Sequence, residues 1–312
     1  MYIGIDLGGT NIAAGLVDGK GTLKLKTSTP TLKNRSPEMI ADDMVRMINE
    51  LLRDAKIDMA DLKGVGIGIP GIVNDKTGEI VYVVNLKNMN GFNISDYIKR
   101  NMNVPVRLAN DADCAALGEY TVSGDGASRF VFITLGTGVG GGVVLDGKIY
   151  TGFNGIGSEL GHMTLIKNGE QCGCGKRGCY EAYASVTALT RDTKRAMECH
   201  PESIMNKIAA ARGKVSGRTA FDAMRQGDEA AAEVVKNYAE YVAEGVVSIE
   251  NIFQPEVIVI GGGISKEGDY LLKPVKEYIE KYRYNKHLQQ TEIKIAQLFN
   301  DAGIIGAAML CK

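Results

Sequence analysis

The sequence predicts two α/β domains with mixed sheets, the second of which repeats the beginning of the first. The chain has 312 residues, which is more than one compact domain of roughly 100–200 residues. Apolar, strand-like runs alternate with amphipathic, helix-like segments in both halves, a pattern typical of α/β domains with covered sheets. A strand pair with an Asp-Gly turn opens each half, so each sheet should contain antiparallel as well as parallel strands.

The repeat consists of a strand, a glycine turn, a second strand and an Asp-Gly turn. The first copy runs from Leu7-Gly-Gly-Thr10 to Asp18-Gly-Lys20, and the second runs from Leu135-Gly-Thr-Gly138 to Asp146-Gly-Lys148. The differences 135 − 7 and 146 − 18 are both 128, so the two copies share one register. This pattern indicates a duplicated domain start, with the second domain beginning near residues 120–130.

In chain order, the first expected helix begins at Ser36-Pro37, because Ser is a favoured N-cap and Pro a favoured first helical residue. Its expected apolar stripe consists of Met39, Ile40, Met44, Ile48, Leu51 and Leu52. Further strands are predicted at 65–69, 104–108 and 257–260, and further helices at 112–120, 229–253 and 301–310. We expect a small N-terminal domain at 1–118, a larger domain at 119–300, and a C-terminal helix within 301–312 that packs back on the first domain.

The composition argues against several functional classes. A formal net charge of −1 leaves no basic excess for binding nucleic acid or an anionic membrane. No apolar run approaches the roughly 20 residues that cross a bilayer, and a strand-like run starts at Tyr2 with no signal-peptide pattern before it. We therefore expect a cytoplasmic protein whose six cysteines are reduced.

Three glycine-rich turns each follow an apolar strand. They are Gly8-Gly9-Thr10, Gly136-Thr137-Gly138 and Gly261-Gly262-Gly263. Without a Cβ atom in the way, backbone N–H groups in such turns can point at an anion, and hydroxyl side chains add donors. A phosphate cradle is one interpretation and a simple tight turn is the other, but two copies in one register favour the cradle. The spacing matches neither a Walker A motif nor a dinucleotide-binding fingerprint.

Asn110-Asp111 lies between a predicted strand and a predicted helix, where α/β proteins present catalytic groups. A carboxylate at this place accepts the proton of a substrate hydroxyl that attacks a phosphoryl group. Alternatively, Asp111 or Asp113 merely caps the helix, and Asn110 either orients a substrate hydroxyl or serves the turn.

A histidine and three cysteines lie in one short segment. They are His162, Cys172, Cys174 and Cys179. Three thiolates and one imidazole form a ligand set of tetrahedral structural zinc sites. The C-x-C-x4-C spacing differs from zinc-finger pairs, and a redox dithiol is the alternative, although the C-x-x-C redox pattern is absent. Zinc is the favoured interpretation, and Glu159 and Glu181 bracket the cluster.

Taken together, these segments resemble the ROK family, named from repressors, open reading frames and kinases. Asp6-Leu-Gly-Gly-Thr-Asn11 is similar to the family's first phosphate motif, Leu135-Gly-Thr-Gly-Val-Gly140 to its second, and Ile260-Gly-Gly-Gly-Ile-Ser265 to its adenosine motif. Gly157-Ser-Glu-Leu-Gly-His162, continuing into Cys172-Gly-Cys-Gly-Lys-Arg-Gly-Cys-Tyr-Glu181, is similar to the family signature. The resemblance covers essentially the whole chain. It implies the ribonuclease H-like fold of actin and hexokinase, with ATP and sugar in a hinged cleft between two related domains.

The resemblance also implies a role for each matching residue. Asp111 matches the catalytic base. The residues that match sugar-binding positions are Gly71, Asn85, Asn88, Asn110, Asp111, Glu159, His162 and Glu181. Those that match ATP-binding positions are Asp6, Gly8, Gly9, Thr10, Asn11, Gly136, Thr137, Gly138, Gly261, Gly262 and Gly263. The implied zinc ligands are His162, Cys172, Cys174 and Cys179. Residues 85–89 resemble the family's Asn-Leu-x-Asn-Trp sugar loop, but Met89 stands where Trp is common, a departure that concerns the identity of the sugar.

The implied activity is that of the family's bacterial glucokinases: phosphorylation of D-glucose to glucose 6-phosphate by ATP with Mg²⁺, with Asp111 as general base and zinc in a structural role. The alternative substrates are fructose, mannose, allose and N-acetylhexosamines such as N-acetylmannosamine. A non-catalytic sugar sensor is a further alternative, but such regulators carry a DNA-binding helix-turn-helix before this core, and the first strand here starts at Tyr2. We expect a homodimer, since two-fold dimers are the commonest oligomers.

Overall fold

The computed structural model describes every residue from 1 to 312 and divides into two compact units. Unit 1 comprises Met1–Gly126, Gly142–Ser158 and Gln297–Lys312, and unit 2 comprises Ala127–Gly141 and Glu159–Ala296. The first division falls after the predicted boundary at residue 118, because the helix that starts at Asp111 continues to Ser123. None of the helices combines the length and the apolar composition that crossing a membrane requires.

Unit 1 contains a five-stranded mixed sheet with the order β3-β2-β1-β4-β7. Its strands are β1 (Tyr2–Leu7), β2 (Asn11–Val17), β3 (Leu23–Pro30), β4 (Val65–Ile69) and β7 (Val106–Asn110). Strands β1, β2 and β3 pair antiparallel, whereas β1, β4 and β7 run parallel to one another. A small antiparallel hairpin of β5 (Ile72–Asn74) and β6 (Glu79–Tyr82) follows β4. The mixed sheet confirms the predicted fold class for this half of the chain.

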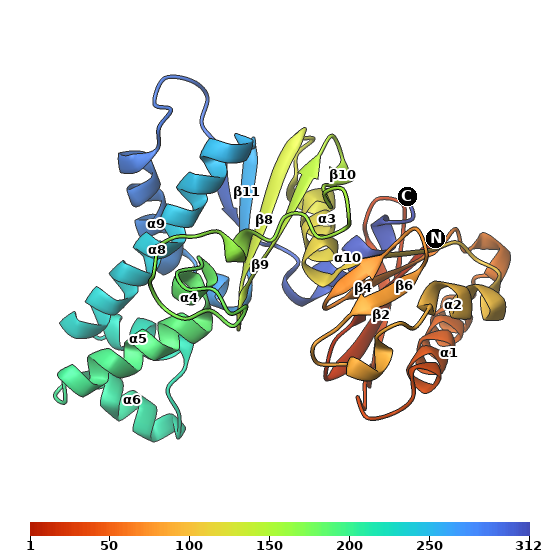
Figure 1. The fold of residues 1–312 in the computed structure, drawn as a ribbon, viewed down its shortest axis with the longest axis horizontal. Coiled ribbons are helices and arrows are strands. Elements are labelled where there is room, and N and C mark those ends of the chain that lie inside the picture. Colours follow the sequence, from red (N-terminus) through yellow and green to blue (C-terminus); the bar gives the residue numbers. More distant parts are fainter. The chain divides into compact units, whose positions relative to one another are not determined.

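Helices cover both faces of this sheet (Figure 1). On one face, Ile3, Ile5 and Leu7 of β1 pack in a core with α1 (Pro37–Ala55) and α2 (Ile94–Met102). On the other face lie α3 (Asp111–Ser123) and α10 (Ala302–Met309). Gly4 and Gly66, which are paired across β1 and β4, allow this contact. A Cβ at Gly4 would lie 1.8 Å from the Ile304 carbonyl oxygen, so the helix backbone rests directly on the sheet.

The second sheet has the order β10-β9-β8-β11-β12, which repeats the strand order of the first. Its strands are β8 (Arg129–Leu135), β9 (Val139–Leu145), β10 (Lys148–Ile149), β11 (Val257–Gly261) and β12 (Glu292–Ile295). Strand β9 lies 128 residues after β2 at both ends, since 139 − 11 and 145 − 17 are both 128. Asp146 and Gly147 turn between β9 and β10 with φ values of 49° and 77°, as an Asp-Gly hairpin requires. The predicted repeat is therefore confirmed.

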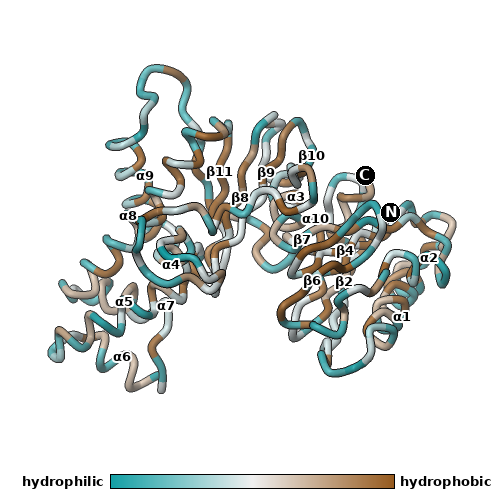
Figure 2. Tube along the Cα trace, in the orientation of Figure 1, coloured by the Kyte–Doolittle hydropathy of each residue, from teal (hydrophilic) through white to brown (hydrophobic).

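Unit 2 carries most of the remaining helices. They are α4 (Glu181–Ala184), α5 (Val186–Cys199), α6 (Ile204–Arg212), α7 (Gly217–Met224), α8 (Glu229–Phe253) and α9 (Asp269–Tyr282). Helices α8 and α9 pack against each other, and β11 is hydrophobic along its length (Figure 2). Short 3₁₀ helices lie at Met59–Asp61, Lys87–Met89, Leu160–His162, Gly263–Glu267 and Phe299–Asp301.

Most predicted elements are present, and the differences are local. The helix predicted at 229–253 has those bounds, and Ser36 caps α1 as expected by accepting a hydrogen bond from the Met39 N–H group. The strand predicted at 104–108 begins two residues later, at Val106. Met39 was placed in the apolar stripe of α1 but is 50 % exposed, because it lies in the first helical turn, away from the sheet.

Candidate active site and metal centre

Unit 1 gathers its predicted site residues at one edge of its sheet. Strands β1, β4 and β7 are parallel, so their carboxyl ends meet at the same edge, where α/β proteins bind ligands. Asp6 lies at the end of β1, Gly71 follows β4, and Asn110 ends β7 directly before Asp111. Residues that are about 100 positions apart in the sequence are therefore neighbours on this edge.

Asn110 and Asp111 form the start of α3. Asn110 is the N-cap residue, and its Oδ1 accepts a hydrogen bond from the Ala112 N–H group at 2.8 Å. Its amide also donates to the Gly71 carbonyl oxygen at 3.1 Å, which ties the loop after β4 to the helix start. Capping by Asp111 or Asp113 was the alternative to a catalytic role, and the N-cap of α3 is Asn110. Asp111 Oδ1 also accepts from the Ala112 N–H group, at 2.9 Å, while Asp113 is buried in the first turn of α3.

Asp6 and Asp111 flank Gly68 of β4. Gly68 is the pairing partner of Asp6, and a Cβ at Gly68 would lie 3.7 Å from the Asp111 Cα atom. Burial, together with the negative charge of Asp111, raises the pKa of Asp6 from 3.8 to about 6. Two carboxylates that share a half-buried edge in this way form an acidic centre suited to proton transfer and to binding a cation.

The first glycine turn joins β1 to β2. The Gly8 N–H group donates to the Asn11 carbonyl oxygen at 2.9 Å, while Thr10 and Asn11 are exposed. Two carbonyl groups of the turn are held by Thr31, a fully buried residue directly after β3. Thr31 could not be predicted as a site residue, because a threonine after a strand carries no distinctive pattern.

The side chains of the predicted sugar loop, residues 85–89, differ in their exposure. Asn85 is exposed and lies beside the first turn, where a Cβ at Gly9 would be 3.6 Å from its Cβ atom. The Asn88 amide instead donates a hydrogen bond to the backbone carbonyl of Arg35. Met89, the departure from the sugar-loop motif, is fully buried in the core of unit 1. Met89 therefore fills the core and is not presented to a ligand.

Unit 2 brings the second and third glycine turns together. Strands β8 and β11 are parallel neighbours, so the turns that follow them, Gly136–Gly138 and Gly261–Gly263, emerge at one edge. Gly262 has a φ of 86°, and a Cβ there would lie 2.2 Å from the Leu135 carbonyl oxygen. Only glycine permits this close approach. Beside Thr137, a groove of about 600 Å³ runs along α5 and is bordered by Thr187 and Lys194.

Glu181 connects the second glycine turn with the cysteine cluster. Its Oε2 atom accepts a hydrogen bond from the Val139 N–H group at 3.0 Å, and Cys172 Sγ donates to its Oε1 atom at 3.3 Å. A Cβ at Gly138 would lie only 2.3 Å from Oε2. Glu159 and His162 belong to one short 3₁₀ turn, in which the His162 N–H group donates to the Glu159 carbonyl oxygen at 3.0 Å.

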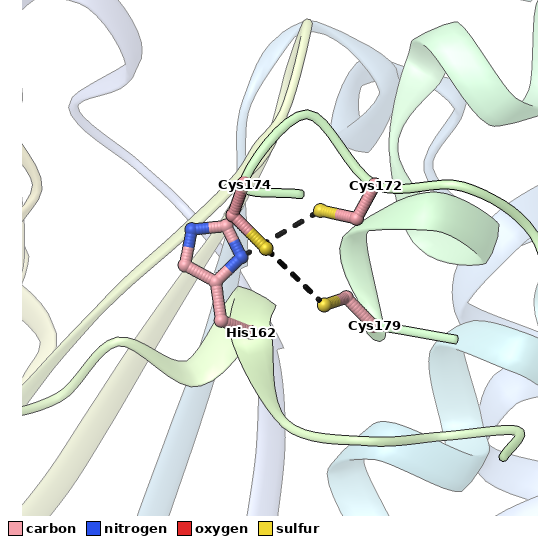
Figure 3. Close-up of side chains that lie close together, drawn as sticks. All are labelled: His162, Cys172, Cys174 and Cys179. Carbon is pink, nitrogen blue, oxygen red and sulfur yellow. Dashed lines mark hydrogen bonds between the residues drawn. The ribbon is translucent and has the colours of Figure 1, made fainter. Parts of the chain in front are cut away.

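The four predicted metal ligands converge on one point (Figure 3). The ligand atoms of His162, Cys172, Cys174 and Cys179 all lie within 4.8 Å of one another. Cys172 Sγ is 3.8 Å from His162 Nδ1, and Cys174 Sγ is 3.7 Å from Cys179 Sγ. A tetrahedral zinc ion with Zn–S bonds of about 2.3 Å separates two sulfur ligands by about 3.8 Å. The donor set and its spacing thus match a closed, four-ligand zinc site.

The pKa values of two thiols in this cluster are shifted in opposite directions. Burial raises the pKa of the Cys172 thiol to about 12, whereas the Lys176 N–H group lowers the pKa of the exposed Cys174 thiol. Metal binding requires thiolates, so it would release the Cys172 proton. No disulfide forms among the six cysteines.

Comparison with known proteins places these features in a family. The model of the ROK family matches residues 2–312. The chain belongs to the ROK family. It is 38 % identical over 313 residues to a glucokinase of Halalkalibacterium halodurans, covering 100 % of this chain and 94 % of that protein. It is 30 % identical over 313 residues to an N-acetylmannosamine kinase of Escherichia coli, covering 99 % and 98 %.

A solved structure agrees with these matches. The crystal structure of a ROK family glucokinase from Streptomyces griseus, in complex with glucose and AMPPNP, superimposes with a TM-score of 0.80 at 32 % identity and covers 99 % of this chain and 98 % of that one. The family resemblance that the sequence motifs predicted is confirmed, and so is the actin- and hexokinase-like fold class.

Proposed function

We propose that this protein is an ATP-dependent hexose kinase that converts D-glucose to glucose 6-phosphate. Membership in the ROK family over residues 2–312 supports a sugar kinase. The similar protein from Halalkalibacterium halodurans is a glucokinase, and the Streptomyces griseus glucokinase was solved with glucose and the ATP analogue AMPPNP. The observation that carries the proposal is the position of Asp111, which opens α3 at the carboxyl edge of the sheet beside Asp6.

In the proposed reaction, Asp111 acts as the general base. The 6-hydroxyl oxygen of glucose forms a bond to the γ-phosphorus of ATP while its proton passes to the Asp111 carboxylate. The bond between the γ-phosphorus and the bridging oxygen breaks, and ADP leaves with the electron pair. Asn110 supports this role, because its cap on α3 and its bond to Gly71 hold the Asp111 backbone in place.

In the proposed reaction, the glycine turns bind the phosphates and the metal cluster has a structural role. Backbone N–H groups of the turns at 8–10 and 136–138, with the hydroxyl groups of Thr10 and Thr137, would stabilise the charge on the phosphates. Mg²⁺ on the nucleotide neutralises part of that charge when it is bound. The zinc-type cluster holds the segment that carries Glu181, so its role is structural.

The identity of the sugar rests on glucokinases being the more similar relatives, at 38 % compared with 30 % identity for the N-acetylmannosamine kinase. N-acetylmannosamine is therefore the second candidate substrate. An additional group such as N-acetyl changes the selectivity for a sugar through the geometry of the pocket. The exposed Asn85 is a residue of this chain that could contact that group. We further propose that the enzyme works in the cytoplasm as a homodimer, which agrees with its free cysteines.

The test is ADP release from MgATP with a panel of hexoses and N-acetylhexosamines and a control without sugar. Release with glucose supports the proposal, release with another sugar alone corrects the substrate, and no release from metal-loaded protein would favour a sugar sensor. Asp111→Asn should lower turnover by about 10²- to 10⁴-fold and leave glucose binding largely intact. Asp96→Asn is the matched control, since Asp96 also lies in the first turn of a helix and its side chain is exposed. Near-normal turnover of Asp111→Asn would refute the assignment.

A further inference from the structure

Residues 31–35, here called the strap, directly follow β3 and hold the first glycine turn. The Thr31 hydroxyl donates a hydrogen bond to the Gly8 carbonyl oxygen at 2.6 Å. The Thr31 N–H group donates to the Thr10 carbonyl oxygen at 2.8 Å. Thr31 is fully buried, so its hydroxyl serves the turn and cannot reach a ligand. A glycine turn has many accessible backbone conformations, and these two bonds select one of them.

The other end of the strap is fixed by Arg35. Its Nη2 atom donates to the Thr31 carbonyl oxygen at 2.9 Å and to Asp43 Oδ2 of α1 at 2.6 Å. The backbone carbonyl of Arg35 accepts a hydrogen bond from the Asn88 amide. The strap thus contacts the first glycine turn through Thr31 and the 85–89 loop through Arg35.

The turn and the loop also touch each other directly. A Cβ at Gly9 would be in ordinary van der Waals contact with Asn85, at 3.6 Å from its Cβ atom. The turn, the strap and the 85–89 loop therefore form a closed set of contacts, in which α1 supplies the anchor at Asp43. The Arg35–Asp43 pair is sheltered, with side-chain exposures of 20 % and 17 %, so water screens it less than a surface ion pair.

We propose that Thr31 and Arg35 are positioning residues that fix the first glycine turn in its phosphate-binding conformation and set the 85–89 loop relative to it. Neither residue is a predicted ligand of sugar or ATP. Thr31 acts through backbone carbonyl groups of the turn, and Arg35 acts through Thr31 and through the side-chain amide of Asn88. This inference rests on the proposed kinase function, because it assigns the turn to the nucleotide and the loop to the sugar. Donors that are already held in place bind developing charge without reorganisation, so a loosened turn should weaken nucleotide binding first.

The decisive variant is Thr31→Val, which keeps the shape of the side chain and removes its hydroxyl donor. Leaving a carbonyl group of the turn without its partner should raise the Kd of MgADP and the KM of MgATP by about 10- to 100-fold. The KM of glucose should change by less than about threefold, since the contact of Arg35 with Asn88 is retained. Thr31→Ser, which restores the hydroxyl, should return both nucleotide constants to near wild-type values. A general structural defect would not produce this difference between the two substrates.

Arg35→Ala provides the second measurement, which also tests the positioning role of the strap if Thr31→Val fails to fold. It releases both the Thr31 carbonyl and the backbone that holds Asn88, so the KM values of MgATP and glucose should both rise. Arg46→Ala is its matched control. Arg46 pairs with the same Asp43 carboxylate at 2.9 Å and with Glu50 at 3.0 Å, both in α1, so both KM values should stay at the wild-type level.

The two proposals can fail separately. A wild-type protein that binds MgADP but phosphorylates no sugar would refute the kinase function, and the MgADP affinities of the variants would still test the strap. Folded Thr31→Val protein with the wild-type Kd for MgADP would overturn the inference. So would equal KM changes for both substrates in Thr31→Val, or an effect of Arg46→Ala as large as that of Arg35→Ala. Wild-type protein that binds no MgADP would overturn both proposals.

Discussion

Replacing Gly138 by alanine should displace Glu181 and thereby weaken sugar binding. A Cβ at position 138 would lie 2.3 Å from Glu181 Oε2 and 3.2 Å from its Cδ atom. Such contacts are not observed below 3.0 Å, so the carboxylate must retreat by at least 0.7 Å, the difference between 3.0 and 2.3 Å. Its bond from the Val139 N–H group is already 3.0 Å long and would be lost. In the proposed complex, glucose would lose its hydrogen bond to the displaced Glu181 carboxylate. A hydrogen bond to a charged group is worth about 1.5–3 kcal/mol, which corresponds to about 10- to 100-fold in glucose affinity.

The measurement is the Kd of glucose by calorimetry in the absence of nucleotide. This choice separates displacement of Glu181 from obstruction of the phosphate site by the new methyl group. Gly136→Ala is the matched control, because it lies in the same turn and its Cβ would have no neighbour nearer than 4.0 Å. Neither glycine has a φ in the left-handed region, so backbone strain does not distinguish them. Unchanged glucose affinity in Gly138→Ala, or equal losses in both variants, would refute the reasoning.

Two further predictions concern stability. Burial and the charge of Asp111 raise the pKa of Asp6 from 3.8 to about 6. Between these pH values, folding therefore takes up a proton. The free energy of unfolding consequently falls as pH rises through this range. Two pKa units correspond to about 3 kcal/mol. Asp6→Asn should therefore be more stable than wild type at pH 7 and lose this pH dependence in urea unfolding at pH 4.5 and 7; an unaltered slope would contradict the assignment. Metal analysis should find one zinc ion per chain, and chelation or Cys179→Ser should remove it and lower Tm, whereas Cys199→Ser, an exposed cysteine outside the cluster, should change neither.

Regular elements and motifs could be predicted because their signals are local or repeated. The helix at Glu229–Phe253 has a long apolar periodicity and an Asp228 cap, and β9 follows from β2 by the constant offset of 128 residues. The zinc-type cluster was predictable because all its ligands lie within one short segment, where the chain itself limits their separation.

The contacts that hold the site could not be predicted in this way. Asn88 matched a sugar-binding position, yet its amide is bonded to Arg35, 53 residues away. The Val139 bond to Glu181 spans 42 residues, and the Thr31 bond to Gly8 spans 23. Sheet order and helix packing bring such partners together. The local sequence around a threonine or an arginine in a loop does not show whether that residue has a distant hydrogen-bond partner. The sequence therefore identified the groups presented at the two sheet edges but not the groups that hold them.

The two copies of the repeat hold their glycine turns by different means, and the difference gives the metal cluster a physical role. In the first copy, β3 is eight residues long, and Thr31 at its end bonds to the turn. In the second copy, the corresponding strand β10 has only two residues, so no residue of an extended third strand is available. The Val186 N–H group and the Thr187 hydroxyl at the start of α5 instead donate to the Gly136 and Thr137 carbonyl oxygens, at 2.8 and 2.7 Å. Glu181, two residues after Cys179, accepts the Val139 N–H bond on the β9 side of the turn. Ordering the cysteine segment with a metal ion should thus fix the Val139 side of the second turn, through Glu181, and leave the first turn unaffected.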